Sequence, residues 1–168
     1  NIDKLLIVMS TSIPAFSSYL IDKFLLIAYK NEIEPIIVIT KTDMITMKEK
    51  SEIKKYINYY RKLKIKIYVN TSVSKIKKEF ANSVVALCGQ TGAGKSTLLN
   101  KIDASLSLKT GEVSTSLGRG KHTTRLVELL EVNDGLIADT PGFSSLELTI
   151  PKKEIKKYYY DFNKPCKY

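Results

Sequence analysis

Short apolar runs alternate along this chain with longer segments in which apolar residues recur every three or four positions. The short runs have the length and composition of strands buried on both faces of a sheet, and the periodic segments predict amphipathic helices that cover the sheet. The order predicted is strand 5–9, helix 17–30, strand 35–39, helix 48–63, strand 65–69, helix 74–81, strand 83–88 and helix 96–102. This alternation predicts an α/β fold with a mostly parallel sheet.

Local patterns refine two of the helices. Ser17 precedes the first helix and is the expected N-cap, because a serine hydroxyl can accept a hydrogen bond from an otherwise unpaired backbone N–H. The second helix is expected to turn its lysines to solvent and four apolar or aromatic side chains inward: Ile53, Tyr56, Ile57 and Tyr60.

The pattern changes in the last third of the chain. Two apolar segments, 125–132 and 136–138, flank Asn133-Asp134-Gly135, which predicts a hairpin closed by an Asp-Gly turn and therefore one antiparallel edge strand. The stretch 105–124 has few large apolar residues and is rich in Gly, Ser, Thr and Lys, so we expect a long loop there.

Composition narrows the class of protein. A chain of 168 residues is long enough for one domain with a proper core and too short for two large ones. No apolar run reaches the ~18 residues that a membrane span needs, so we expect a cytoplasmic protein with no membrane partner. Two cysteines at unrelated positions, Cys88 and Cys166, fit a reducing compartment, and Cys88 is expected to be a small buried apolar residue.

The net charge is +10, from 27 Lys+Arg against 17 Asp+Glu. Such a charge favours polyanionic partners, RNA above all. The alternative is a compositional bias, because AT-rich coding DNA also produces chains rich in Lys, Ile, Asn and Tyr, and the lysines here are spread along the chain.

A nine-residue segment between the fourth strand and the last helix matches the pattern of a phosphate-binding loop, G-x-x-x-x-G-K-[ST]. Its residues are Gly89, Gln90, Thr91, Gly92, Ala93, Gly94, Lys95, Ser96 and Thr97. Glycines let consecutive backbone N–H groups point at phosphate oxygens, and the following helix presents its positive end to the same anion. We expect Lys95 to reach the β- and γ-phosphates and the Ser96 hydroxyl to bind Mg²⁺.

Two further elements match the rest of a nucleotide site. Asp139-Thr140-Pro141-Gly142 follows an apolar strand, so Asp139 can hold Mg²⁺ directly or through water, and the Gly142 N–H can meet a γ-phosphate. In the long loop, Thr123 or Thr124 can close over Mg²⁺ when the γ-phosphate is present. His122, the only histidine, either positions water or a proton there or is merely structural.

The base-specificity element lies upstream of the phosphate loop. Thr40-Lys41-Thr42-Asp43 follows the second strand where guanine-nucleotide proteins carry Asn-Lys-x-Asp. The Asp43 carboxylate can accept from the guanine N1–H and exocyclic amine, whereas adenine would leave it unpaired. The Lys41 stem can pack over the base, and Thr71-Ser72 can offer a backbone N–H to the guanine O6.

These boxes, together with residues 110–114 and 117–124, resemble the circularly permuted GTPases of the RsgA/YjeQ family, the small-ribosomal-subunit-dependent GTPases of bacteria. The likeness runs along the whole chain, and in an ordinary GTPase the phosphate loop comes first instead. The departure from the pattern is Thr40, where the box has Asn. The resemblance implies a circularly permuted P-loop fold, with a GTPase domain at 1–148 and the start of a truncated zinc-type domain at 149–168.

The resemblance also implies a function. Such proteins bind GTP or GDP with Mg²⁺, hydrolyse GTP slowly until the small subunit stimulates them, and act late in 30S maturation. The expected partners are the 30S subunit and its 16S rRNA, and the protein is expected to be a monomer. Family members carry an RNA-binding barrel of OB type before this core, which is absent here. Cys166 matches the first ligand of the family's zinc domain, so Zn²⁺ is expected only in a longer protein.

Two other functions stay open on the sequence. Thr40 is compatible with an adenine-nucleotide enzyme such as a kinase, and the net charge is compatible with an RNA-binding module whose nucleotide site is vestigial. The complete set of Lys95, Ser96 and Asp139 favours the GTPase over the vestigial site.

Overall fold

The computed structural model describes residues 1–69, 73–108, 128–139 and 150–159. The elements follow one another as β1 Lys4–Ser10, α1 Ser18–Lys30, β2 Glu34–Thr40, α2 Met47–Lys62, β3 Lys66–Val69, α3 Val73–Lys78, β4 Val84–Cys88, α4 Lys95–Ile102, a 3₁₀ turn at Ala104–Leu106, β5 Glu128–Val132, β6 Gly135–Asp139 and α5 Lys152–Tyr158. The predicted strands and helices up to residue 102 are confirmed within one to three residues at each end. The 3₁₀ turn and α5 were not predicted.

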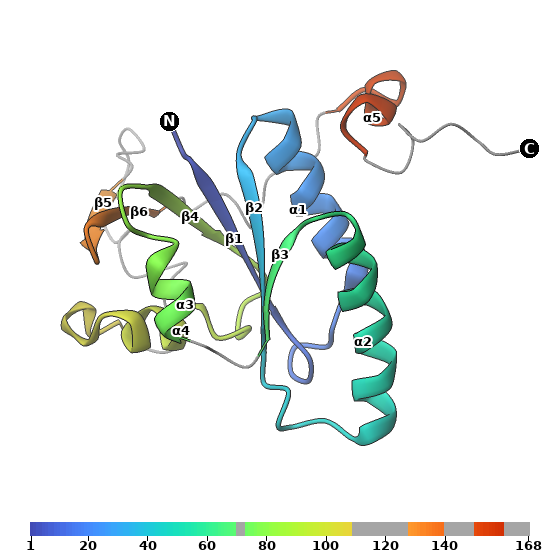
Figure 1. Cartoon of the computed structure of the whole chain (residues 1–168), viewed down its shortest axis with the longest axis horizontal. Helices are drawn as coiled ribbons and strands as arrows, with labels where there is room; N and C mark the ends of the chain where they lie inside the picture. The colour runs from blue at the N-terminus through green and yellow to red at the C-terminus, as the bar shows by residue number, and fades with distance from the viewer. Residues whose placement is uncertain (70–72, 109–127, 140–149, 160–168) are drawn as a thin grey trace, which may run out of the picture.

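The six described strands form one sheet in the order β3-β2-β1-β4-β6-β5 (Figure 1). All neighbouring pairs are parallel except β5 and β6, whose antiparallel pairing confirms the predicted hairpin and edge strand. Parallel strands end at the same edge of a sheet, so β1, β2, β4 and β6 all end at one edge. This arrangement matches the mostly parallel α/β fold expected from the sequence.

The core consists of two layers, one on each face of the sheet. Alternate residues of β1 point to opposite faces, so Leu5 and Ile7 pack with α1 and α2, whereas Leu6 and Val8 pack with α3 and α4. Figure 1 shows the same division, with α1 and α2 on one side of the sheet and α3 and α4 on the other. Because β1 is covered on both faces, its near-continuous apolar run is explained.

The turn of the β5–β6 hairpin differs from the prediction. Asn133 and Asp134 form the two-residue loop with φ of +47° and +59°, and Gly135 is the first residue of β6, paired with Val132. A Cβ on Gly135 would lie 1.8 Å from the backbone oxygen of Phe80. The glycine is therefore required by this close approach and not by the turn.

The prediction that the Tyr56 side chain of α2 points into the core is also wrong. Tyr56 is 42% exposed, while Ile53, Ile57 and Tyr60 are buried. At 100° per residue Tyr56 lies at the edge of the stripe that these three form, where its ring packs 5.5 Å from that of Phe16. The cap of α1 is confirmed, because the Ser17 hydroxyl accepts a hydrogen bond from the Leu20 N–H at 3.3 Å.

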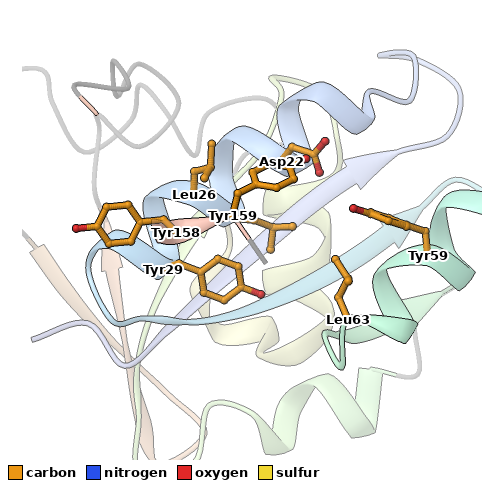
Figure 2. Close-up of a pocket in the computed structure, with 8 residues that line it drawn as sticks. Asp22, Leu26, Tyr29, Tyr59, Leu63, Tyr158 and Tyr159 are labelled. Atoms are coloured by element: carbon orange, nitrogen blue, oxygen red, sulfur yellow. The ribbon is translucent and has the colours of Figure 1, made fainter. Parts of the chain in front are cut away.

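A shallow, mostly apolar pocket lies where α5 packs against α1 and the end of α2 (Figure 2). Tyr29 and Leu63, near the carboxyl ends of α1 and α2, line it together with Tyr158 and Tyr159. Helices α1 and α2 run antiparallel to the strands, so this seam lies away from the edge where the strands end. Among the described helices, none is both long and apolar enough to cross a bilayer.

Candidate functional site

The phosphate-binding loop connects β4 to α4, as its sequence predicts. Gly89 has φ +134°, and a Cβ there would lie 2.0 Å from the backbone oxygen of Val8 in the neighbouring strand. Gly94 has φ +98° and is the N-cap of α4, with no side-chain cap. These two positions need glycine, because a side chain would clash at the first and strain the backbone at both. The strand–loop–helix context that makes the motif credible is therefore present.

Lys95, the first residue of α4, folds back over the loop. Its Nζ donates to the backbone oxygens of Gly89 and Gln90 at 2.8 and 2.9 Å. Burial lowers the pKa of Lys95, and the neighbouring Cys88 opposes that shift. Within the described residues Lys95 forms no ion pair, so carbonyl dipoles alone compensate its charge. A half-buried ammonium in this setting favours an incoming anion.

The rest of the loop fits the same ligand. The Ser96 side chain is nearly buried, where the motif puts a hydroxyl for Mg²⁺, and Ala93 is fully buried. Thr91, Gly92 and Thr97 are exposed. The buried Gln90 Oε1 has no hydrogen-bond partner in the described part of the chain. The Lys95 ammonium and the N-terminus of α4 together favour a bound phosphate group, whereas the Gln90 oxygen is an acceptor and adds nothing to the binding of an anion.

Thr40 connects the second predicted box to the phosphate loop. Its hydroxyl donates to the backbone oxygen of Ala93 at 2.7 Å, with the oxygen of Met9 at 3.3 Å. Thr40 is 8% exposed and closes β2, in the place where the family box has Asn. The threonine thus holds the loop through its hydroxyl, in place of an amide.

Lys41 makes a second connection between the same two segments. Its Nζ donates to the backbone oxygen of Gly92 at 2.9 Å and also to that of Ile13, in the loop after β1. The backbone of Lys41 is left-handed, with φ +58°. Thr42 is buried and Asp43 is exposed, so the Asp43 carboxylate is open to a ligand beside the loop that Lys41 holds.

Sequence reasoning missed Thr11. Its hydroxyl donates to the backbone oxygens of Lys41 at 2.7 Å and Thr40 at 3.1 Å, and its own N–H donates to Thr40. Thr11 therefore holds the turn that gives Lys41 its left-handed backbone. A signal was present, because Thr11 follows an apolar strand in a parallel sheet, at the edge where ligands bind.

The other predicted site residues are placed only in part. Asp139 is the last residue of β6, and β6 lies beside β4, with Ala138 opposite Ala86, so Asp139 ends at the same edge as the phosphate loop. Its side chain is not described. Seven further candidates lie outside the described residues: Thr71, Ser72, His122, Thr123, Thr124, Gly142 and Cys166. The described part of the chain contains no group of three or more His, Cys, Asp or Glu that could hold a metal ion.

Cys88 agrees with its expected structural role. It is 1% exposed at the end of β4, and burial raises the pKa of its thiol well above the usual range, although Lys95 opposes the shift. The thiol is therefore protonated and unreactive at neutral pH.

A model of the family RsgA GTPase matches residues 1–149. The chain belongs to the RsgA GTPase family. Relatives named small ribosomal subunit biogenesis GTPase RsgA include those of Halalkalibacterium halodurans, 44% identical over 95% of this chain, and Phytoplasma mali, 46% identical over 96%. These matches cover 56% and 55% of the relatives, so the chain spans little more than half of their length.

Solved structures of the RsgA family agree with the fold. YjeQ from Thermotoga maritima is 30% identical, with a TM-score of 0.79, over 96% of this chain and 56% of its own. YloQ, described as a circularly permuted GTPase, is 35% identical with a TM-score of 0.75, over 96% of this chain and 52% of its own. The P-loop fold predicted from the order of the boxes is therefore confirmed, with the segment after β2 preceding the phosphate loop in the chain.

Proposed function

We propose that this chain is the unit of a ribosome assembly factor that binds GTP with Mg²⁺ and hydrolyses GTP. The observation that carries the proposal is the pair of hydrogen bonds from Thr40 to Ala93 and from Lys41 to Gly92. They join the segment with Asp43, which can select guanine, to the loop that can hold phosphates. Two elements that lie 51 to 53 residues apart in the chain thus form a single site that one nucleotide can span.

Each residue has a distinct part in this proposal. The backbone of the loop from Gly89 to Thr97 and the Lys95 ammonium bind the phosphates, and α4 adds its positive end. Ser96, Asp139 and one of Thr123 and Thr124 would hold Mg²⁺, which would neutralise phosphate charge. Asp43 accepts from the guanine edge, the Lys41 stem covers the base, and Thr71 and Ser72 face the guanine O6.

The hydrolysis step needs a group that orients the attacking water. Phe143 follows Gly142 where signalling GTPases place a glutamine, and an apolar ring cannot polarise water. We propose that His122 or an element of the ribosome supplies this group, while Thr123 or Thr124 and Gly142 respond to the γ-phosphate. If His122→Ala leaves turnover in the presence of small subunits unchanged, the histidine has no such role.

The partner in this proposal is the small ribosomal subunit with its 16S rRNA, met by a cytoplasmic, monomeric protein during late maturation. The names of the relatives support the subunit. Residues 1–148 are the GTPase unit, and residues 149–168 begin a second unit in which Cys166 is a zinc ligand. GTP hydrolysis measured with and without purified 30S subunits tests this partner directly: the subunits should accelerate it severalfold or more.

Guanine selection is tested by exchanging the base and the side chain together. In Asp43→Asn, the amide can donate to the C2 carbonyl of xanthine but no longer accepts two hydrogen bonds from guanine. We expect weaker binding of GDP by at least about tenfold, because two charge-assisted hydrogen bonds are lost, and a gain for xanthosine diphosphate, because the amide can form two neutral hydrogen bonds with xanthine. Calorimetry measures both, with ADP as the control nucleotide. Tighter binding of ADP than of GDP by the unmodified chain would favour the adenine-nucleotide alternative.

A further inference from the structure

Basic residues outside the nucleotide site are unevenly distributed. Between Glu52 and Glu79 the chain has 26 residues without one Asp or Glu. The nine basic residues of this stretch are Lys54, Lys55, Arg61, Lys62, Lys64, Lys66, Lys75, Lys77 and Lys78. Five of them lie on α2 or just after it, and all five of those are exposed. A run of basic residues with no acidic residue among them therefore lies along and just after one helix, although the lysines look scattered in the sequence.

The geometry of α2 turns this charge into a linear surface. Ile53, Ile57 and Tyr60 hold one side of the helix in the core. Lys48, Lys55 and Lys62 recur every seven residues on the opposite, exposed side, which places them about 10.5 Å apart along the helix axis. At 100° per residue, Lys54 and Arg61 lie about 100–120° around the helix from this row, and Lys64 follows the end of the helix. Together these six exposed residues form what we name the α2 basic face.

The two acidic residues of α2 do little to neutralise this face. Glu49 turns back to the start of the helix, where its carboxylate accepts from the N–H and hydroxyl of Thr46, at 2.8 and 2.7 Å. Glu52 pairs with Lys55 at 2.8 Å, but both side chains are more than half exposed, so the pair is weak and Lys55 can exchange its partner. Lys66 is not included, because it is paired with Glu34 and Glu79.

We propose that the α2 basic face binds the phosphate backbone of double-helical RNA. A row of regularly spaced ammonium groups suits a sequence-independent contact with the phosphates of a duplex. Insertion of α2 into a membrane is excluded, because the apolar side of the helix is already used in the core, and a purely electrostatic contact with an anionic membrane is one outcome of the test below. The proposal rests on the proposed function in one respect, since it takes ribosomal RNA as the source of the duplex.

The position of this face leaves the nucleotide site free. Figure 1 shows α2 as an outer element of the molecule, next to the edge strand β3 and on the opposite side of the sheet from α4. The helix begins at Met47, four residues after Asp43, and then runs antiparallel to the strands, away from the carboxyl edge where the nucleotide would bind. RNA can therefore lie along α2 while a nucleotide occupies the carboxyl edge of the sheet.

The test compares two variants of the full chain with equal charge change. One carries Lys48→Gln, Lys55→Gln and Lys62→Gln on the α2 basic face. The control carries Lys78→Gln, Lys101→Gln and Lys153→Gln, which are exposed on α3, α4 and α5. The probe is a fluorescent 16-base-pair RNA hairpin, titrated from 50 to 200 mM salt. We expect the α2 variant to bind at least about tenfold more weakly at 100 mM salt and to lose about three from its salt slope, whereas the control loses less than one.

The outcomes separate this proposal from the proposed function. Equal losses in the two variants, or no loss in the α2 variant, would overturn the proposal, because binding would then follow net charge or another surface. Binding to vesicles of 30% phosphatidylglycerol or to polyglutamate that needs the α2 lysines, without RNA binding, would also overturn it. GDP calorimetry on the same variants should give unchanged affinity, so a chain that binds no nucleotide would fail the proposed function and leave the RNA result standing. A matched loss of co-sedimentation with 30S subunits identifies ribosomal RNA as the source.

Discussion

Polar side chains are paired in opposite ways at the two ends of the sheet. At the carboxyl edge, Thr11, Thr40, Lys41 and Lys95 all donate to backbone carbonyls of loops. At the amino edge, the carboxylate of Glu79 accepts from the Tyr68 hydroxyl at 2.6 Å and from Lys4 and Lys66 at 3.2 Å each. Among the described residues, charged groups are thus paired with charged groups at the amino edge and with backbone dipoles at the carboxyl edge.

This difference separates stability from binding. The Glu79 cluster connects the start of β1, the start of β3 and the end of α3, and all of its charges have partners. The carboxyl edge keeps two ammonium groups with no ion pair among the described residues, and their carbonyl partners belong to loops that can adjust. The two ammonium groups at the carboxyl edge can form ion pairs with a bound phosphate group. The charges around Glu79 are already paired, so a ligand would gain no new ion pair at the amino edge. Substitutions at the carboxyl edge should therefore weaken nucleotide binding, and substitutions at the amino edge should lower the free energy of unfolding.

The largest expected effect is on binding at the carboxyl edge. Lys95→Ala should weaken GDP binding by about 100-fold, or about 2.7 kcal/mol, because a charge-assisted contact to phosphate is lost. The free energy of unfolding without nucleotide should change by less than about 1 kcal/mol, since removing a partly buried ammonium offsets its two lost hydrogen bonds. Calorimetry and urea unfolding measure the two quantities, with the exposed Lys101→Ala of the same helix as control. A loss of stability with unchanged affinity would reverse the comparison.

The next effect is on stability at the amino edge. Glu79→Gln should lower the free energy of unfolding by about 2 kcal/mol, because Lys4 and Lys66 lose a shared, mostly buried carboxylate. GDP affinity should stay within about twofold. Urea unfolding is the measurement, and Glu131→Gln, an exposed position on β5, is the matched control. If GDP binding suffers more than stability does, the two ends are coupled and the separation drawn above is wrong.

A smaller effect is expected where the two boxes of the site meet. Thr40→Val removes the hydroxyl that donates to Ala93 at 2.7 Å while keeping the shape of the side chain. We expect a cost of about 1 kcal/mol in stability and about fivefold in GDP affinity, because the buried carbonyl loses its partner and the loop its support. Thr40→Ser retains the hydroxyl and should restore most of both. A variant Thr40→Val that binds GDP normally would show that the loop holds its shape without this bond.

The smallest effect is the pH dependence of the Glu79 cluster. Burial pushes the pKa of Glu79 upward, but the hydrogen bonds from Tyr68, Lys66 and Lys4 outweigh it and hold the pKa below its usual value. A lowered pKa in the folded state stabilises the protein above the pKa of the unfolded chain, and this stabilisation is lost as the pH falls through the folded value. The stability difference between the unmodified chain and Glu79→Gln should therefore shrink by up to about 1 kcal/mol between pH 7 and pH 3, as urea titrations can measure. A difference that grows on acidification would contradict this.

Much of the fold and the motifs of the site follow from local sequence. Apolar runs and helical periods predict β1, β2, β4 and the helices up to α4, since burial on both faces or on one stripe determines the type of residue at each position. The phosphate loop can equally be recognised from the sequence, because Gly89, Gly92 and Gly94 have positive φ angles that favour glycine. Tyr56 and Gly135 were misjudged, because the neighbours that decide them, Phe16 and Phe80, are distant in sequence.

What only the tertiary structure decided is how distant segments meet. No pattern in the sequence shows that the Thr40 hydroxyl donates to Ala93, that Lys41 reaches Gly92 and Ile13, or that Thr11 holds the turn between them. Nor does it show that the Glu79 carboxylate gathers two lysines and a tyrosine from two other strands. The sequence by itself determines which residues can form strands, helices and a phosphate loop, since those choices depend on near neighbours. Partners across the sheet depend on strand order and register, which follow from the packing of the whole chain.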